Sequence, residues 1–251
     1  MATQTVIAYP WSQDVPALND FLTKVFGAVE KERAVGSAGG YHTELLIGDT
    51  LLMVGGGGAG VTWTGEARPM AFHIYVPDVD TTWKLAQEQG AESLQAPANQ
   101  EWGERTANVK DLSGNFWYIA TFQGSNYFSD GAPTVQPFLQ PLRAAPVIDF
   151  MKAAFAANEL GRATTPEGVI LHTTVKIGNS AMELIDAVGI YQPMPGRFFV
   201  TVEDADYSYA LALASGAKPV SPPADQPYGA RVGGVEDIAG NLWYVASELK
   251  K

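Results

Sequence analysis

The sequence predicts an α+β fold made of four βαβββ units, arranged as two tandem modules. The stretch at 107–121 (ANVKDLSGNFWYIAT) recurs at 233–247 (GGVEDIAGNLWYVAS), and the match continues upstream at an offset of 126 residues. Segments with helical and with strand periodicity also follow one another in the same order in both copies. A register held over this length indicates a duplication, with modules at residues 1–124 and 133–251.

Each module opens with a strand and an amphipathic helix. In the first module, Asp14 is expected to cap the helix, Pro16 fits its first turn, and Gly27 ends it. Apolar residues recur between them at the spacing of a buried helix face: Leu18, Phe21, Leu22, Val25 and Phe26. Two strands then meet at Gly48-Asp49, or at Gly178-Asn179 in the second module, and both pairs are favoured hairpin turns.

The second half of each module reads as a strand, a helix and a hairpin. The strand is AFHIYV or RFFVTV, and the helix is expected to end at Gly90 or Gly216. In the repeated phrase, Asp and Gly-Asn supply the turn chemistry, Trp supplies core contact, and Tyr points to the opposite face. The front halves align at an offset near 130, so the first module has four extra residues near VGGGGAG. The segment GSNYFSDGAP is expected to link the modules.

Composition and charge exclude several classes of function. The chain has 251 residues and no cysteine, and 16 basic residues against 27 acidic ones give a net charge of −11. This excess repels a phosphate backbone or an anionic bilayer, so we expect neither nucleic acid nor membrane as a partner. Disulfides and thiolate sites are excluded. Because no long apolar run and no signal-peptide pattern is visible, we expect a cytoplasmic protein.

The four βαβββ units and the phrase DxxGNxWY resemble the vicinal oxygen chelate superfamily, which includes glyoxalase I, extradiol dioxygenases and bleomycin-binding proteins. The stretches IDFMKAAFAANELGR and DQPYGARVGGVEDIAGNLWYVAS look most similar to glyoxalase-like proteins of the PhnB type. The resemblance covers nearly the whole chain and implies two glyoxalase-like half-barrel modules. It implies the fold more strongly than the reaction, because this fold carries many activities.

The resemblance also implies where a metal ion would be held. In the first module, the register places Ile7, Met53, Ala71 and Tyr118 at the ligand positions, and none of them suits a divalent ion. In the second module it places Gln136, Glu183, Arg197 and Tyr244 there, and the charge of Arg197 would repel a cation. We therefore expect no cofactor. A divalent metal bound by Gln136, His172 and Glu183 stays open as the alternative.

Six side chains are candidates for contact with a small-molecule ligand: His42, His73, Tyr118, His172, Arg197 and Tyr244. His42 and His172 are equivalent, and the hairpin register places Glu183 opposite Thr174 and on the face of His172. A purely structural role is the competing interpretation for these two histidines. His73 has Phe199 as its counterpart, so the fold does not require a histidine there, and imidazole can donate, accept or act as a base.

The two tyrosines stand where related enzymes carry a ligating glutamate, and a phenol there can bind a substrate oxygen or simply form a cavity wall. Arg105 and Arg231 are expected to pair with a loop or a local aspartate instead. No catalytic residue is assigned.

The function we expect is binding of a small, partly apolar molecule in the half-barrel clefts, with a metal-independent lyase or isomerase activity left open. One alternative is a metal-dependent glyoxalase- or dioxygenase-like enzyme. Another is a drug-sequestering protein, whose acidic charge would attract a cationic drug. Because a tandem chain supplies both modules itself, we expect a monomer or a loose homodimer.

Overall fold

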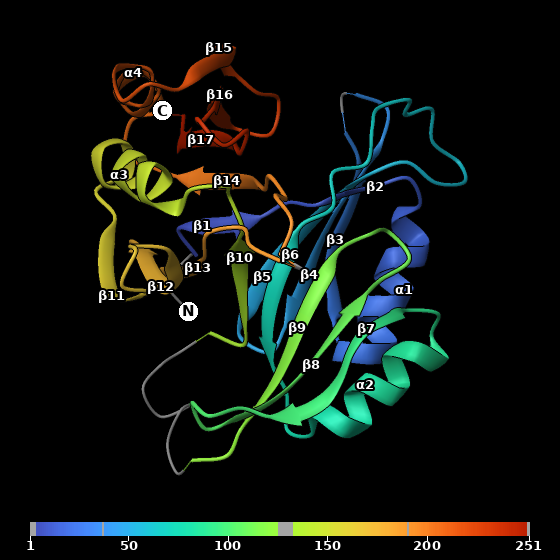
Figure 1. Ribbon diagram of the computed structural model, residues 1–251. Helices are drawn as coiled ribbons and strands as arrows, with labels where there is room; N and C mark the ends of the chain where they lie inside the picture. The colour runs from blue at the N-terminus through green and yellow to red at the C-terminus, as the bar shows by residue number, and fades with distance from the viewer. Residues whose placement is uncertain (1–3, 37, 125–132, 190, 250–251) are drawn as a thin grey trace. The chain divides into compact units, whose positions relative to one another are not determined.

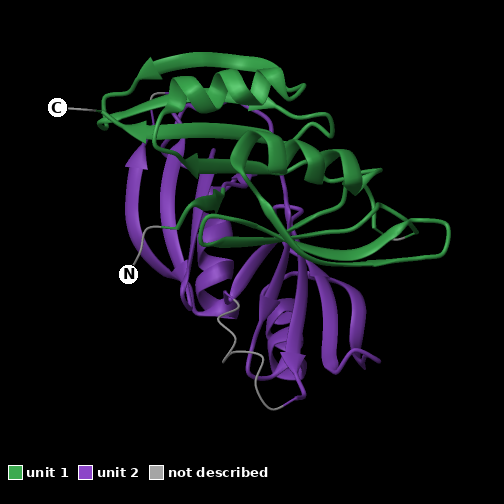
Figure 2. Cartoon of the chain, turned by 90° about the vertical axis from the view of Figure 1, so that its left-hand side faces the viewer, with its two compact units in different colours: residues 1–8, 138–251 green, residues 9–137 purple. Residues whose placement is uncertain are grey.

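The computed structural model describes residues 4–36, 38–124, 133–189 and 191–249 (Figure 1). The chain divides into two compact units, which Figure 2 shows in different colours: unit 1 contains residues 1–8 and 138–251, and unit 2 contains residues 9–137. Most of the expected linker, residues 125–132, lies outside the described residues. The first strand of the chain therefore belongs with the second sequence module.

Four βαβββ motifs follow one another, as the sequence predicts. The first contains β1 (Val6–Ala8), β2 (Trp11–Ser12), α1 (Val15–Phe26), β3 (Val29–Val35), β4 (Tyr41–Ile47) and β5 (Thr50–Gly56). The second contains β6 (Ala71–Tyr75), α2 (Val79–Glu88), β7 (Glu92–Asn99), β8 (Glu104–Lys110) and β9 (Phe116–Phe122). The third contains β10 (Val135–Leu139), α3 (Ala144–Phe155), β11 (Asn158–Thr164), β12 (Ile170–Ile177) and β13 (Ser180–Leu184). The fourth contains β14 (Arg197–Thr201), α4 (Ala205–Ala214), β15 (Lys218–Asp225), β16 (Ala230–Glu236) and β17 (Leu242–Glu248).

Each unit contains strands from two motifs. In unit 2, one sheet has the order β2-β5-β4-β3, and a second runs β6-β9-β8-β7 with residues 135–137 of β10 paired to β6. In unit 1, one sheet has the order β1-β14-β17-β16-β15, and a second runs β11-β12-β13 with residues 138–139 of β10 paired to β13. The opening strand of each module thus pairs with the other module, β1 with β14 and the start of β10 with β6.

The two predicted hairpin turns hold these opening strands in place. Asp49 Oδ1 accepts a hydrogen bond of 2.7 Å from the amide of Thr134, and Asn179 Oδ1 accepts one of 2.8 Å from the amide of Thr5. Gly48 has a φ of +59°, and a Cβ built on it would lie 2.2 Å from Thr134 Oγ1. Glycine is therefore required by the backbone conformation and by the approach of the opening strand.

The helix signals are confirmed. Asp14 accepts a hydrogen bond from the amide of Ala17 at the start of α1, and Gly27 ends the helix in the left-handed conformation. Helix α2 ends at Glu88, two residues before Gly90. No helix in the described part of the chain is long and apolar enough to cross a bilayer.

The repeated phrase builds a buried hydrogen-bond hub. Asp111 accepts from the amides of Ser113 and Asn115, from Asn115 Nδ2 and from Trp117 Nε1, at 2.8 to 3.0 Å. Asp237 makes the equivalent four bonds in unit 1. Burial raises the pKa of both carboxyl groups, although the four donors act in the opposite direction. Trp117 and Trp243 are fully buried, which confirms their predicted core role.

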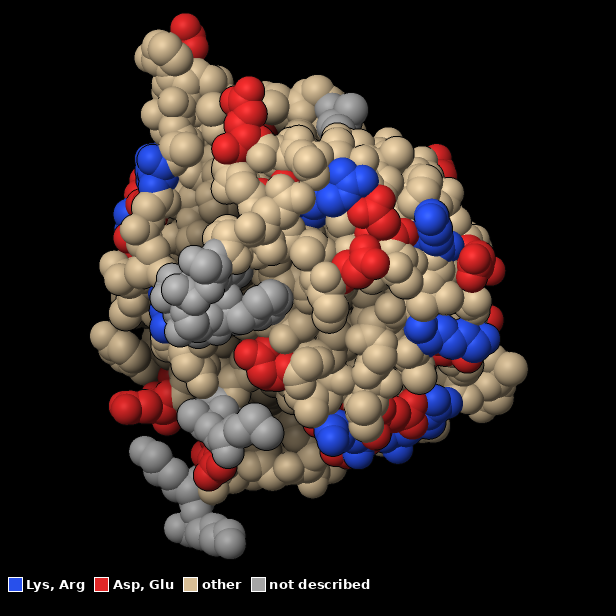
Figure 3. All heavy atoms as spheres, turned by 90° about the horizontal axis from the view of Figure 1, so that it is seen from below, with Lys and Arg blue, Asp and Glu red and all other residues tan. Residues whose placement is uncertain are grey.

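Charged side chains of both signs lie interspersed on the face seen in Figure 3. Arg105 Nη2 lies 2.8 Å from an oxygen of Asp80, and Arg231 Nη2 lies 2.8 Å from an oxygen of the equivalent Asp206. The expectation that these arginines pair with a local aspartate is confirmed, and they are assigned to structure.

Candidate functional site

A row of polar side chains crosses one sheet of unit 2. Gln136 on β10 lies opposite His73 on β6, His73 lies beside Tyr118 on β9, and Tyr118 lies opposite Asn108 on β8. Asn108 Nδ2 then donates a hydrogen bond of 2.9 Å to Gln95 Oε1 on β7. Directly paired residues share a face of a sheet, so each of five strands contributes one polar group to the same face. These five residues are called the polar row below.

Three members of the polar row are buried, whereas Tyr118 is partly exposed and Gln95 is exposed. Gln136 is 2% exposed, Asn108 5% and His73 9%. Burying polar groups costs free energy unless hydrogen bonds compensate, as the bond between Asn108 and Gln95 does within this row. Next to the polar row, the ring centroids of Tyr75 and His73 lie 4.5 Å apart. The hydroxyl of Tyr75 donates a hydrogen bond of 2.9 Å to Glu104 Oε1.

Unit 1 provides an internal comparison, because the same register recurs there. Its equivalent row is Ile7, Phe199, Tyr244, Gly234 and Ser221. Only the tyrosine is common to both rows. The fold therefore accommodates Ile7, Phe199 and Gly234 at the positions of Gln136, His73 and Asn108, so these three polar side chains are not needed to build the sheet.

The structure brings together two of the predicted residues in unit 1. Arg197 is 3% exposed, and its Nη2 donates a hydrogen bond of 2.9 Å to the hydroxyl of Tyr244. The guanidinium carbon also lies 5.0 Å from the centroid of the Tyr244 ring. Since an arginine keeps its charge in proteins, this pair supplies a fixed positive group beside a phenol.

His42 is placed in a separate cluster on the β2-β5-β4-β3 sheet of unit 2. Its Nδ1 lies 2.8 Å from the hydroxyl of Tyr9, and its Nε2 lies 3.9 Å from Glu44 Oε1. The side chains of His42 and Glu44 are 26% and 25% exposed, so solvent reaches both. Gly55 makes room for this cluster, because a Cβ there would lie 2.9 Å from atoms of Tyr9 and Trp11.

His172 lies in unit 1 beside Glu183, with 3.3 Å between His172 Nε2 and Glu183 Oε2. Thr174 pairs with Glu183, which confirms the predicted hairpin register. The side chain of His172 is 49% exposed and that of Glu183 is 3% exposed. Gln136, which the sequence register groups with Glu183 and Arg197, pairs instead with His73 in unit 2.

Neither unit, in its described residues, shows a cluster of the side chains that most often bind metal ions. Within the described ranges, no three or more His, Asp, Glu or Cys side chains are grouped so that they could hold an ion. His172 and Glu183 supply two donors, whereas catalytic metal sites in proteins generally use three protein ligands. No step of the chemistry below is therefore assigned to a metal.

Sequence reasoning missed Tyr9, Asn108 and Gln95. The signal for Asn108 and Gln95 was present, since the offset of 126 residues aligns them with Gly234 and Ser221. Tyr9 aligns with Phe138 when α1 and α3 are superimposed in sequence. A difference between modules at an otherwise repeated position is the pattern that all three share.

Residues 11–119 match the family described as Glyoxalase/Bleomycin resistance protein/Dioxygenase superfamily. An uncharacterized protein of Mycobacterium tuberculosis strain H37Rv is 31% identical over 140 residues, covering 51% of this chain and 82% of the relative. An uncharacterized protein of Mycobacterium bovis is 32% identical over 130 residues, covering 47% of this chain and 86% of the relative.

Two solved structures share the fold over nearly the whole chain. Glyoxalase I from Zea mays has a TM-score of 0.73 at 16% identity, covering 98% of this chain and 92% of that one. A proposed dioxygenase from Bacillus subtilis has a TM-score of 0.63 at 13% identity, covering 99% and 87%. At these identities the likeness shows the fold alone.

Proposed function

Since the chain belongs to the glyoxalase/bleomycin resistance protein/dioxygenase superfamily, we propose that it binds a small, partly apolar molecule at the polar row of unit 2. The single observation that carries this proposal is the contrast between two equivalent rows of one duplicated fold. Gln136, His73 and Asn108 stand where unit 1 has Ile7, Phe199 and Gly234. Buried polar groups that the fold does not require are typical of a binding site. A PhnB-like affiliation, which rests on the sequence phrases, is part of the same proposal.

The chemistry of the row indicates what the ligand carries. The amides of Gln136 and Asn108 both donate and accept hydrogen bonds, as do the imidazole of His73 and the phenol of Tyr118. Gln, Asn and Tyr side chains are neutral at pH 7, so a histidine is the only residue type in the row that can carry a charge near that pH. Hydroxyl or carbonyl oxygens on a small apolar scaffold match these groups. A strongly cationic drug does not, because the row contains no carboxylate.

The experiment exchanges the two rows at one position. His73→Phe copies the residue of unit 1, so the fold is expected to tolerate it, and Phe199→His is the matched control. Small hydroxyl- and carbonyl-bearing compounds are screened against the wild-type protein by ligand-observed NMR, and each hit is titrated into both variants. We expect His73→Phe to weaken binding at least about tenfold, which corresponds to about 1.4 kcal/mol. Binding that survives His73→Phe but is lost in Arg197→Met would move the site to unit 1.

Metal-independent proton transfer is a second candidate function, favoured by the hydrogen bond of 2.8 Å between Tyr9 and His42. A substrate proton would pass to the Tyr9 oxygen while the phenolic proton passes to His42 Nδ1, and the nearby Glu44 carboxylate would stabilise the imidazolium. Return of both protons completes an isomerisation without a co-reactant. Phe138 occupies the place of Tyr9 in the third motif, so Tyr9→Phe is expected to fold. Exchange of the α-hydrogens of hydroxyacetone with D₂O tests this proton transfer. An equal exchange rate in the wild type and in Tyr9→Phe would reject it.

A further inference from the structure

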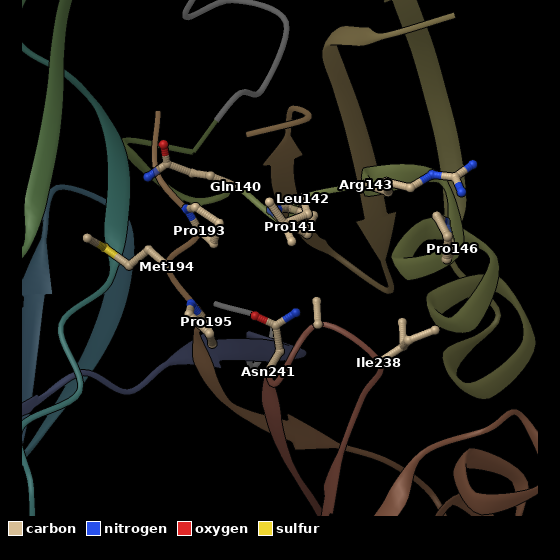
Figure 4. Close-up of a pocket in the computed structure, with 11 residues that line it drawn as sticks. Gln140, Pro141, Leu142, Arg143, Pro146, Pro193, Met194, Pro195, Ile238 and Asn241 are labelled. Atoms are coloured by element: carbon tan, nitrogen blue, oxygen red, sulfur yellow. The ribbon is translucent and has the colours of Figure 1, made fainter. Parts of the chain in front are cut away.

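Unit 1 contains a pocket of about 360 Å³ that belongs to neither the polar row nor the predicted site residues. It is lined by the segment between β10 and α3, the first turn of α3, the segment before β14, and the turn between β16 and β17 (Figure 4). The side chains that matter below are Pro141, Leu142, Met194, Pro195, Ile238 and Ala239. The volume lies within the range of small-molecule sites in proteins.

The equivalent position in unit 2 carries polar side chains. Aligning α1 with α3 places Pro141 and Leu142 where the first module has Ser12 and Gln13, and the offset of 126 residues places Met194 and Ala239 where it has Arg68 and Ser113. In unit 2 the hydroxyl oxygens of Ser12 and Ser113 lie 2.7 Å apart, and Ser12 is 1% exposed. Gln13 Nε2 also donates a hydrogen bond of 3.0 Å to the carbonyl of Gly65.

All four of these replacements run from polar to apolar. Without the hydroxyl pair, nothing equivalent to the Ser12–Ser113 bond can form between Pro141 and Ala239, whose side chains have no donor or acceptor. The shared fold does not require apolar side chains here, since its other copy carries polar ones at the same four positions. The change is therefore specific to this position in unit 1.

Apolar side chains predominate in the lining of the pocket, and Gln140, Arg143 and Asn241 are its polar members. The amide of Asn241 is committed, because its Oδ1 accepts from the amide of Gly196 at 2.7 Å and its Nδ2 donates to Asp237 at 2.9 Å. Proline rings with fixed φ angles make much of the wall rigid. Leu142 and Ile238, at 73% and 74% exposure, are large apolar side chains that face solvent beside the pocket. Exposed apolar groups gathered at one place mark binding sites on soluble proteins.

We propose that this pocket binds a small apolar molecule with a flat ring, of about the size of indole. Flat rings match the proline faces and the flexible thioether of Met194, which contacts aromatic groups favourably. None of the lining residues belongs to the polar row, so this site goes beyond the proposed function. The pocket proposal also holds if ligand binding at the polar row is disproved.

Indole itself is the probe, and the methyl group of Met194 is the reporter. The chain has only six methionines, so a spectrum of protein labelled with ¹³C at the methionine methyl groups is simple, and Met194→Leu identifies the signal. We expect a saturable shift of the Met194 signal as indole is added. Ala239→Leu fills the pocket and is expected to weaken indole binding at least tenfold. Ser113→Ala, at the equivalent position of unit 2, is the matched control and is expected to leave indole binding unchanged.

Two results would overturn the proposal. The first is a Met194 signal that does not respond to indole, or that responds equally in Ala239→Leu. The second is a Met194 shift that follows protein concentration without indole, because the pocket would then hold an apolar side chain of a second copy. The urea midpoint of each variant shows that it is folded. His73→Phe leaves indole binding unchanged if the two sites are independent, so failure here is distinguishable from failure of the proposed function.

Discussion

Replacement of Asp111 by asparagine tests whether the repeated phrase is a structural hub. The change keeps the shape of the side chain, and the retained oxygen can still accept from the amides of Ser113 and Asn115. The other oxygen becomes an NH₂ group that faces two donors, Asn115 Nδ2 and Trp117 Nε1, both at 2.9 Å in the native structure. Two hydrogen bonds are lost, and two buried donors are left without an acceptor.

The magnitude follows from these two lost bonds. Leaving a buried donor unsatisfied costs about 1–3 kcal/mol, so the pair predicts a loss of about 2–6 kcal/mol. Burial raises the pKa of Asp111, which means that the ionised carboxylate carries a desolvation penalty, and the neutral amide relieves part of it. We therefore expect a net loss of about 2–4 kcal/mol in the free energy of unfolding.

Urea unfolding at pH 7, followed by tryptophan fluorescence, measures this loss. Asp80→Asn is the matched control, because it removes the half-exposed ion pair with Arg105, and we expect it to lower the free energy of unfolding far less than Asp111→Asn does. Asp237→Asn should reproduce the effect in unit 1, where the same four bonds are present. A loss below about 0.5 kcal/mol in both hub variants would refute the reasoning, since it would fall within the range of ordinary surface substitutions.

Three further predictions concern a turn, an ion pair and the Tyr9–His42 cluster. Gly48→Ala should destabilise the protein by more than Gly27→Ala in thermal unfolding, because both glycines have positive φ but only at Gly48 would a Cβ lie 2.2 Å from another side chain; equal losses would contradict this. The hydrogen bond from Arg162 lowers the pKa of Glu159 from 4.5 to about 2. Burial raises this pKa, whereas hydrogen bonds from Lys152 and Thr173 lower it further. The ionised Glu159 carboxylate therefore stabilises the protein above pH 4.5, and this stability is lost as the pH falls towards 2. The urea midpoint should fall less steeply between pH 4.5 and pH 2 in Glu159→Gln than in the wild type. An equal fall in both proteins would refute this prediction. Tyr9→Phe should change the ¹⁵N chemical shift of His42 Nδ1, because it removes the hydroxyl that lies 2.8 Å from this nitrogen. The control Phe138→Tyr should leave the shift unchanged. No change in Tyr9→Phe would show that the hydrogen bond between Tyr9 and His42 is not formed in solution.

Local elements were predictable because their signals are local. Asp14, Gly27 and the Gly48-Asp49 turn set helix and hairpin ends through short-range backbone chemistry, and the structure places each as expected. The partner of each opening strand was not predictable. The strands that contain Ile7 and Gln136 occupy equivalent places in the repeat, so pairing within a module and pairing between modules satisfy the same pattern.

The candidate site was predictable in part for the same reason. His73 and Tyr118 stood out because they lie on regular strands and have known counterparts at an offset of 126 residues. The repeat marks Gln95 as different between the modules, but its face of the sheet could not be deduced, because β7 has register shifts on both sides of it that break the two-residue alternation. Grouping Gln136 with His73 needed the strand exchange, which only the three-dimensional pairing reveals.

The most direct test of the central claim uses the three histidines of the chain. His42 contacts Tyr9, His73 pairs with Gln136, and His172 contacts Glu183. Protein labelled with ¹³C in its histidine rings gives one signal each for His42, His73 and His172, and the hits of the compound screen are titrated into it. The polar row predicts that the His73 signal shifts with ligand while the His172 signal stays in place, and that the response is lost in Gln136→Ile, which copies the residue of unit 1. A ligand that binds and shifts His172 or His42 without His73 would contradict the account.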